Sequence, residues 1–322
     1  MRIALLLGFI TSAVSGFTVN NRCLRHTATK LSSSQSFADT AIAISSSAAK
    51  LNGKTVVVKY GGNAMTSPEL ALKFCEDVAT LQNLGIRVVV VHGGGPQISA
   101  MLEKVAVETR FEGGMRVSSP EVVEVAEMVL CGAVNKKISA AICSAGGRAI
   151  GLSGRDDCLL QCTKQTNKDG VDLGFVGQVE SVNTLLLEQL LELGITPVVS
   201  PIGTGIGEES NIAYNVNADV AAGRIAGELE AERVLFLTDI AGVLDKDMSL
   251  LRRLTVQQIM DLIEDETITG GMIPKVTYAT SAVQQGVGSA FITDGRVPHA
   301  LLNQVLDDDS DNAAGGTIVS LD

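Results

Sequence analysis

The sequence predicts an α/β protein: a three-layer sandwich in which an open, mainly parallel central sheet carries helices on both faces. Short strands alternate with helices along the chain, which is the pattern of a parallel sheet. Several of these strands are apolar throughout, such as Ile86–Val91, as expected where both faces of a strand are buried. Glycine numbers 33, roughly a tenth of the chain, where about 7% is usual.

Each element has a local signal in the sequence. Ser67-Pro68-Glu69 combines a serine N-cap, a proline in the first turn and an acid near the positive end of the helix dipole, and Gly85 ends this helix. Ser119-Pro120-Glu121 repeats the signal, and Thr255-x-x-Gln258 is a capping box. Strands are expected at 54–59, 86–91, 149–152, 175–182, 196–202, 233–237, 288–292 and 317–321. Further helices are expected at 95–102, 185–193, 218–227, 259–263, 275–285 and 300–306. The glycines of Gly203-x-Gly205-x-Gly207 are interpreted as a mobile loop.

Composition excludes several classes of function. The formal charge of −11 repels phosphate backbones, and aromatic residues make up only 3% of the chain, so nucleic-acid binding is not expected. Three histidines leave little material for a zinc site or a histidine-based triad. The sequence therefore predicts no resident metal site.

The first fifty residues differ from the rest. They hold five basic residues and one acid, so the −11 of the whole chain conceals a body, residues 51–322, at −15. Arg2, the apolar run 3–10 and the small residues after it describe a signal peptide, and the stretch after Phe17 has transit-peptide composition. The apolar run is too short for a membrane span of ~20 residues. We expect residues 1–50 to be a bipartite presequence, largely disordered, that directs the chain to the plastid stroma.

Ordinary secretion is the alternative for this leader. The body retains an odd number of cysteines (Cys75, Cys131, Cys143, Cys158 and Cys162), and none of them forms a CxxC pair, which argues against a secreted disulfide framework. We expect residues 51–322 to form one folded unit with two lobes, and no membrane association of the mature chain.

Two glycine turns follow predicted strands directly. Tyr60-Gly61-Gly62-Asn63 comes after a strand that ends near Lys59, and His92-Gly93-Gly94-Gly95 follows the next strand and opens a helix. Bare backbone N–H groups at such places can approach an anion closely. Isolated glycine pairs are more often tight turns. Two of them after neighbouring strands favour phosphoryl transfer between a nucleotide and an acid, which requires positioning and charge neutralisation.

Other polar residues are candidates with a structural alternative each. Arg116 suits bidentate binding of a carboxylate, or a surface salt bridge. Asn215 and Asn217 alternate along an extended stretch, and one of them is expected to act as an N-cap. Lys275 lies one turn past Gly270-Gly271, where a capped helix start is the alternative. Asp219 and Asp239 complete the set.

With these residues collected, the body resembles the amino-acid kinase family, and within it the N-acetylglutamate kinases of plants. The resemblance covers about residues 54–318. Its motifs stand in this order: VVVKYGGNAM (56–65), VVVHGGGPQI (89–98), GGMRVSSPE (113–121), NVNAD (215–219), LTDIAGVL (237–244), GGMIPKV (270–276) and DGRVPHALL (294–302).

The resemblance implies transfer of the γ-phosphoryl group of ATP to the γ-carboxylate of N-acetyl-L-glutamate, a step of arginine synthesis. Lys59 and Lys275 would flank the transferring group, Asp219 would hold both lysines, and Gly62 and Gly94 would donate N–H bonds to phosphoryl oxygens. The acylated amino acid would be bound in the N-terminal lobe by Gly94, Gly95, Arg116, Asn215 and Asn217. The nucleotide would be bound in the C-terminal lobe by Thr238, Asp239, Gly242, Val243, Leu244 and Gly271.

The resemblance also implies partners and regulation. Mg²⁺ would be carried by ATP, and the chain would form homo-oligomers, either dimers or hexamers interlaced by a helix at 37–51. The PII signal protein is a partner by resemblance only. Arginine-sensitive relatives carry a glutamate where this chain has Gln304, and a neutral amide loses a charge-assisted bond, so weakened arginine inhibition is expected.

Rival functions stay open at this point. Aspartate kinase, glutamate 5-kinase and uridylate kinase are the enzymatic alternatives, and a non-catalytic arginine sensor is the alternative from another class. Lys59, Asp219 and Lys275 argue against the sensor because a protein without catalysis does not need them.

Overall fold

The computed structural model describes residues 33–65, 67–166, 170–306 and 315–322. The chain divides into two compact units, residues 1–43 and residues 44–322. Helix α1 (Ser33–Leu51) crosses this boundary, and its last residues contribute Ala48 and Leu51 to the buried interior of the second unit. The presequence boundary predicted at residue 50 thus falls inside a helix, and the signal and transit motifs before residue 33 lie outside the described residues.

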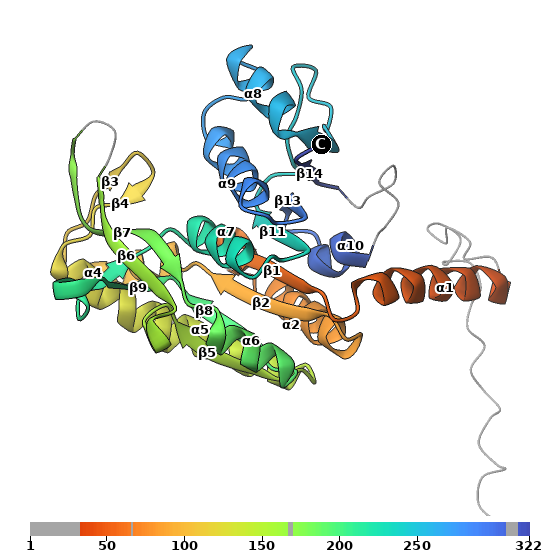
Figure 1. The fold of residues 1–322 in the computed structure, drawn as a ribbon, viewed down its shortest axis with the longest axis horizontal. Helices are drawn as coiled ribbons and strands as arrows, with labels where there is room; N and C mark the ends of the chain where they lie inside the picture. The colour runs from red at the N-terminus through yellow and green to blue at the C-terminus, as the bar shows by residue number, and fades with distance from the viewer. Residues whose placement is uncertain (1–32, 66, 167–169, 307–314) are drawn as a thin grey trace, which may run out of the picture. The chain divides into compact units, whose positions relative to one another are not determined.

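An eight-stranded sheet forms the centre of the second unit, and neighbouring strands are parallel except for β13 and β14, which pair antiparallel next to the edge strand β12 (Figure 1). The strands predicted for it are confirmed, except that the one predicted at 196–202 ends at Ser200 and Ile202 begins a strand of another sheet. Strand β12 is an addition that the sequence did not indicate. The order across the sheet is β12 (Arg253–Thr255), β14 (Thr317–Ser320), β13 (Ser289–Asp294), β11 (Arg233–Thr238), β1 (Thr55–Tyr60), β2 (Arg87–His92), β8 (Thr196–Ser200) and β5 (Ala149–Ser153).

Helices cover both faces of this sheet, which confirms the predicted three-layer sandwich. Successive residues of β1 point to opposite faces: Val57 belongs to one hydrophobic core, and Val56 and Val58 belong to the other. The first core contains residues of α6 (Leu185–Glu192), α7 (Ala218–Glu228), α8 (Val256–Glu264) and α9 (Met272–Gln284). The second contains residues of α2 (Pro68–Asn83), α3 (Gly95–Lys104), α4 (Pro120–Glu127), α5 (Asn135–Ser144) and α10 (Ala300–Leu306).

The predicted helix starts are confirmed by their hydrogen bonds. The Ser67 hydroxyl accepts from the Leu70 N–H, and the Ser119 hydroxyl accepts from the Val122 N–H. Thr255 and Gln258 form the complete reciprocal capping box. Among the described residues, no helix is long and apolar enough to cross a membrane.

The long helix predicted from Ser119 onward is interrupted. After α4, residues Met128–Val134 form π-helical turns, and α5 continues from Asn135. Most residues of this segment are compatible with ordinary helix, and Gly132 is the one residue in it that weakens a helix.

The mobile loop predicted at 203–207 is wrong for its first half. Ile202–Gly205 is strand β9, which belongs to a closed four-stranded sheet with β6 (Leu160–Thr166), β7 (Asp172–Val182) and β10 (Ala213–Asn215). The glycines serve close packing: a Cβ on Gly203 would lie 2.4 Å from the Cys162 sulfur. Glycine in a strand can mark such a close approach rather than a loop.

Candidate active site

The two predicted glycine turns lie side by side at the carboxyl ends of β1 and β2. The Gly93 N–H donates to the Tyr60 carbonyl over 2.8 Å. A Cβ placed on Gly93 would lie 4.0 Å from Gly61 Cα and 3.9 Å from the side chain of Ala218, the first residue of α7. The turns and the N-terminus of α7 therefore meet at one point, where exposed N–H groups and the helix dipole favour an anion.

Lys59 and Asp219 form an ion pair at this meeting point. Lys59 Nζ lies 3.2 Å from Asp219 Oδ1, with side chains 15% and 21% exposed. Asp219 occupies the first turn of α7, where the Asn217 side-chain oxygen accepts from the N–H groups of Asp219 and Val220. The predicted N-cap is thus Asn217.

Lys275 has a different partner from the predicted one. Its Nζ lies 3.2 Å from Oδ1 of Asp239, which directly follows β11, while Asp219 pairs with Lys59. Asp239 and the first turn of α9 both lie at the carboxyl edge of the sheet, so this contact is short although 36 residues separate the two. The bond to Lys275 lowers the pKa of the Asp239 carboxyl.

The three predicted glycines of the two turns differ in what their positions require. Gly94 precedes α3, and a Cβ on it would lie 2.5 Å from Cδ2 of Leu130. Gly62 is exposed and adopts φ +66°, a left-handed conformation that favours glycine. Gly95 begins α3 and has open space around it.

Arg116 is a buried cation without an acidic partner in the described parts of the chain. Its guanidinium donates to the Gly95 carbonyl (3.1 Å), the Ser99 hydroxyl (2.8 Å) and the Thr109 hydroxyl (3.2 Å). It also lies 4.7 Å from the Phe111 ring centroid, across the hairpin of β3 (Phe111–Glu112) and β4 (Met115–Arg116). Burial lowers the pKa of Arg116. The predicted surface salt bridge is not formed here, so the positive charge is left for a ligand.

Asn215 ends β10, and its amide donates to the Ser118 hydroxyl over 3.2 Å. Ser118 is two residues from Arg116 and bonds to its carbonyl. The structure therefore brings Arg116, Asn215 and the Gly94-Gly95 turn into one bonded neighbourhood, in agreement with the predicted substrate set.

The residues predicted to bind nucleotide surround the carboxyl end of β11. The Thr238 hydroxyl bonds to the backbone of Ile240, and Val243 N–H donates to the Thr317 hydroxyl. Gly242 adopts φ +141° and packs so closely that a Cβ would lie 2.7 Å from Thr317 Oγ1. Leu244 bridges to Leu250, and Gly271 precedes α9. These bonds shape the loop after β11.

Sequence reasoning missed two contacts at this edge. It did not find the Lys275–Asp239 pair, and it treated His92 only as the start of a glycine turn. His92 is fully buried and contacts Asn135, another fully buried polar residue. The sequence held one signal for this contact: His92 follows four consecutive valines. A polar side chain at the end of such an apolar strand is expected to be buried with it and to need a hydrogen-bond partner.

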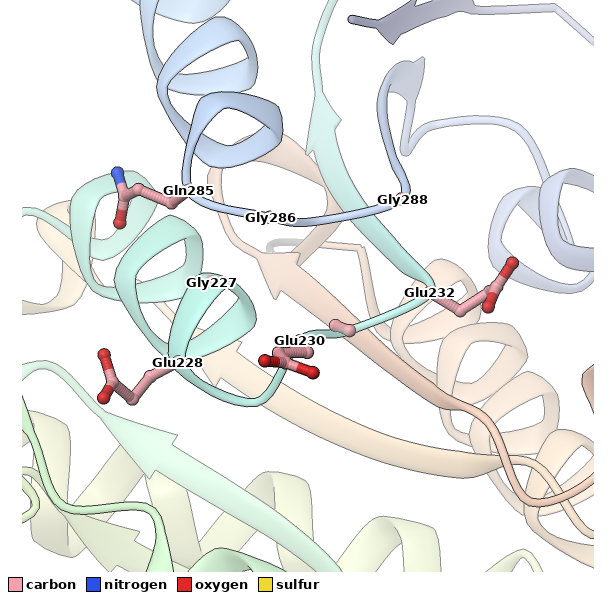
Figure 2. A pocket seen from close by; sticks show the side chains of 8 residues that line it. Gly227, Glu228, Glu230, Glu232, Gln285, Gly286 and Gly288 are labelled. Atoms are coloured by element: carbon pink, nitrogen blue, oxygen red, sulfur yellow. The ribbon is translucent and has the colours of Figure 1, made fainter.

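A hollow of about 510 Å³ lies at the opposite ends of α7 and α9 and contains none of the candidate residues (Figure 2). Three glutamates line it: Glu228, Glu230 and Glu232. Where the chain is described, no three His, Cys, Asp or Glu side chains come together in a way that could hold a metal ion.

Comparison with known proteins gives the family. The profile of the amino acid kinase family matches residues 54–294. The chain belongs to the amino acid kinase family. Acetylglutamate kinase of Neisseria meningitidis serogroup C (strain 053442) is 49% identical over 263 residues, which cover 80% of this chain and 87% of the relative. Acetylglutamate kinase of Rhizorhabdus wittichii is 51% identical over 259 residues, covering 78% and 85%.

Solved structures share the fold of this chain. N-acetylglutamate synthase from Neisseria gonorrhoeae, complexed with coenzyme A and N-acetyl-glutamate, superimposes with a TM-score of 0.75 at 22% identity. The match covers 88% of this chain, which spans 63% of that synthase. Carbamate kinase from Giardia lamblia bound to AMP-PNP gives a TM-score of 0.60 at 18% identity, covering 84% and 99%. At these identities the likeness concerns the fold.

Proposed function

We propose that this kinase transfers the γ-phosphoryl group of ATP to the γ-carboxylate of N-acetyl-L-glutamate, as in arginine synthesis. The observation that carries the proposal is Arg116: a buried guanidinium without a carboxylate among its described neighbours, bonded to the turn that carries Gly94. It suits the α-carboxylate of the acceptor, because a guanidinium forms charge-assisted hydrogen bonds to a carboxylate. Relatives about half identical to this chain carry the name acetylglutamate kinase.

In the reaction, a γ-carboxylate oxygen attacks the γ-phosphorus, the bond from that phosphorus to the β–γ bridging oxygen breaks, and ADP leaves with the bond electrons. The carboxylate is already ionised, so no general base is needed. Lys59 and Lys275 neutralise charge on the phosphoryl oxygens, while Gly62 and Gly94 offer N–H donors. Asp219 and Asp239 each hold one lysine in place.

Mg²⁺ would be bound by the ATP phosphates, whose charge it neutralises. Asp219 and Asp239 are engaged by lysines, which fits an ion that arrives with the nucleotide rather than one held by a protein cage.

A panel of acceptors tests the assignment. The full chain is assayed with ATP and Mg²⁺ against N-acetylglutamate, glutamate, aspartate and UMP, and the acyl phosphate is trapped with hydroxylamine. We expect N-acetylglutamate to give the highest kcat/KM. Preference for glutamate or aspartate would replace the proposal by another carboxylate kinase of the family, preference for UMP by a uridylate kinase, and no turnover by a sensor.

We also propose that arginine inhibits this enzyme weakly. Gln304 of α10 is buried, and in the described structure its side-chain oxygen has no hydrogen-bond partner, so it offers neither charge nor access to a guanidinium. Activity is measured against rising arginine; half-inhibition in the micromolar range would contradict this.

We extend the proposal to the cellular location, the oligomeric state and the PII protein as a partner. The basic, hydroxyl-rich composition of residues 1–50 supports import into a plastid stroma, and a fluorescent protein fused behind these residues tests it. Light scattering of the purified chain separates dimer from hexamer, and the same measurement with added PII protein tests that partner.

A further inference from the structure

His92 is a fully buried polar side chain at the end of β2, and the reaction described above assigns it no role. Burying a polar ring costs free energy unless its nitrogens are bonded. Nδ1 of His92 lies 2.9 Å from the Gly93 carbonyl oxygen, and Nε2 lies 3.1 Å from Nδ2 of Asn135. Both nitrogens are therefore engaged, each with one specific group.

These partners determine which nitrogen carries the proton. A carbonyl oxygen only accepts, so Nδ1 must hold the hydrogen and donate it to Gly93. Nδ2 of Asn135 lies 2.7 Å from the Val198 carbonyl and 3.1 Å from the Leu152 carbonyl, so its two hydrogens are shared among these oxygens and Nε2 of His92. An amide nitrogen donates and does not accept, so Nε2 contributes a lone pair to this contact. Burial lowers the pKa of His92 to about 4, so the ring is neutral at neutral pH.

The side-chain amide of Asn135 favours one orientation, although that orientation leaves its oxygen without a hydrogen bond. Its side-chain oxygen is buried and has no partner among the described residues. The opposite orientation would place that oxygen against two carbonyl oxygens, of Val198 in β8 and Leu152 in β5, which is repulsive. Asn135 thus anchors the imidazole to the two strands beside β2.

Holding the Gly93 carbonyl also sets the direction of a second group. The described backbone has no cis peptide bonds, and in a trans peptide the C=O and N–H point in opposite directions. The peptide that carries the Gly93 oxygen carries the Gly94 N–H at its other end. Gly93 N–H is bonded to Tyr60, so both sides of Gly93 are held.

We infer that His92 is a positioning residue for phosphoryl transfer: its Nδ1–H holds the Gly93 carbonyl, and this directs the Gly94 N–H at the transferring group. The inference rests on the proposed function. Asn135 supports the ring, and Leu130, from the π-helical turns just before Asn135, closes the space beside Gly94. Residues 130–135 therefore hold the imidazole through Asn135 and pack against the glycine turn through Leu130.

Two substitutions separate the nitrogens of His92. In H92N the amide nitrogen takes the place of Nδ1 and can still donate to Gly93; in H92Q the amide takes the place of Nε2, so the bond to Gly93 is lost. We expect H92Q to lower kcat for N-acetylglutamate about 10- to 100-fold, the scale of one misdirected oxyanion donor, with KM for ATP within twofold. H92N is expected to keep kcat within about threefold, since the donor is retained.

S139A is the matched control. Ser139 is buried in α5, the helix of Asn135, and among the described residues its hydroxyl bonds only to the Lys136 carbonyl within the same helix. Its kcat should equal that of the wild type. Thermal unfolding is followed for all variants, so that kcat refers to folded enzyme. A wild-type kcat in H92Q, or a kcat in H92N as low as in H92Q, overturns the inference.

A readout independent of turnover is the ¹⁵N spectrum of the histidines, with His92 assigned by its loss in H92N. We expect the neutral Nδ1–H form at pH 7; an Nε2–H form or a charged ring overturns the inference. If the wild type prefers another acceptor, the proposed function fails, and the same kinetic comparison on that acceptor decides the role of His92.

Discussion

The two ends of α7 and α9 differ in charge although they belong to the same pair of packed helices. The N-terminal ends carry Asp219, which pairs with Lys59 beside the glycine turns, and Lys275, which pairs with Asp239. The C-terminal ends border the hollow with Glu228, Glu230 and Glu232 (Figure 2). Helix dipoles give the first ends a positive potential and the second ends a negative one. The glutamates add to the negative potential around the hollow, whereas at the first ends Asp219 opposes the dipole and Lys275 adds to it.

The difference teaches how a chain of net charge −11 can bind two anions. The acids of the hollow are separated from the site by the length of each helix, which rises about 1.5 Å per residue. Water and salt screen their charge over that distance. Backbone N–H groups and a few placed cations then set the local potential at the site.

The largest effect is expected from Lys275→Ala. Removing a cation that faces the transferring phosphoryl group should lower kcat about 10²- to 10³-fold. Turnover is measured by hydroxamate trapping, with circular dichroism to show that the fold persists. An unchanged kcat would remove Lys275 from the mechanism. The charge at the N-terminal end of α9 would then matter as little for catalysis as the charge around the hollow.

A smaller and selective effect is expected from Arg116→Lys. Lysine keeps the charge but loses the planar fork, so kcat/KM for N-acetylglutamate should fall about 10- to 100-fold, while KM for ATP stays within twofold. Initial rates at varied concentrations of each substrate separate the two constants. An equal rise in both KM values would speak for a structural role instead.

Asp239→Asn should have a modest effect, because the Lys275–Asp239 pair is the more exposed of the two, with side chains 29% and 53% exposed. We expect kcat to fall about two- to fivefold, in keeping with the weak contribution of exposed pairs. Asp219→Asn, in the more buried pair with Lys59, is the comparison and should cost more.

The Lys275–Asp239 pair also predicts how the effect of Asp239→Asn depends on pH. Lys275 lowers the pKa of Asp239 in the folded state, so the carboxylate stabilises the fold above its unfolded pKa and this contribution is lost as pH falls through the lowered folded pKa. The kcat ratio of wild type to Asp239→Asn should therefore be flat around neutral pH. A ratio that changes there would show that another group titrates at the pair.

The smallest effect is expected at the hollow. The double variant Glu228→Gln, Glu230→Gln changes two exposed side chains, so kcat should stay within twofold and the free energy of unfolding within about 0.5 kcal/mol. Chemical denaturation and the trapping assay check both. A marked gain in affinity for ATP would show that the acids of the hollow do repel the substrate.

The sequence predicted the sheet, the caps and the two glycine turns because each depends on signals within a few residues. Ser67, Ser119 and Thr255 bond to N–H groups three residues ahead, so their effect can be seen locally. The partner of Lys275 could not be found in that way, since it depends on which of two aspartates lies nearer in space. The closed sheet around Gly203 was missed because glycine in a packed strand resembles glycine in a loop.

The π-helical turns of Met128–Val134 determine where the helix after them points its side chains. Each residue of an α-helix turns the chain by about 100°, so one residue more or less in this segment would rotate every side chain of α5 by that angle about the axis. Asn135 would then face away from His92. A single deletion here should harm the enzyme more than most substitutions in the same helix, because it would redirect a whole face while leaving composition and length almost unchanged.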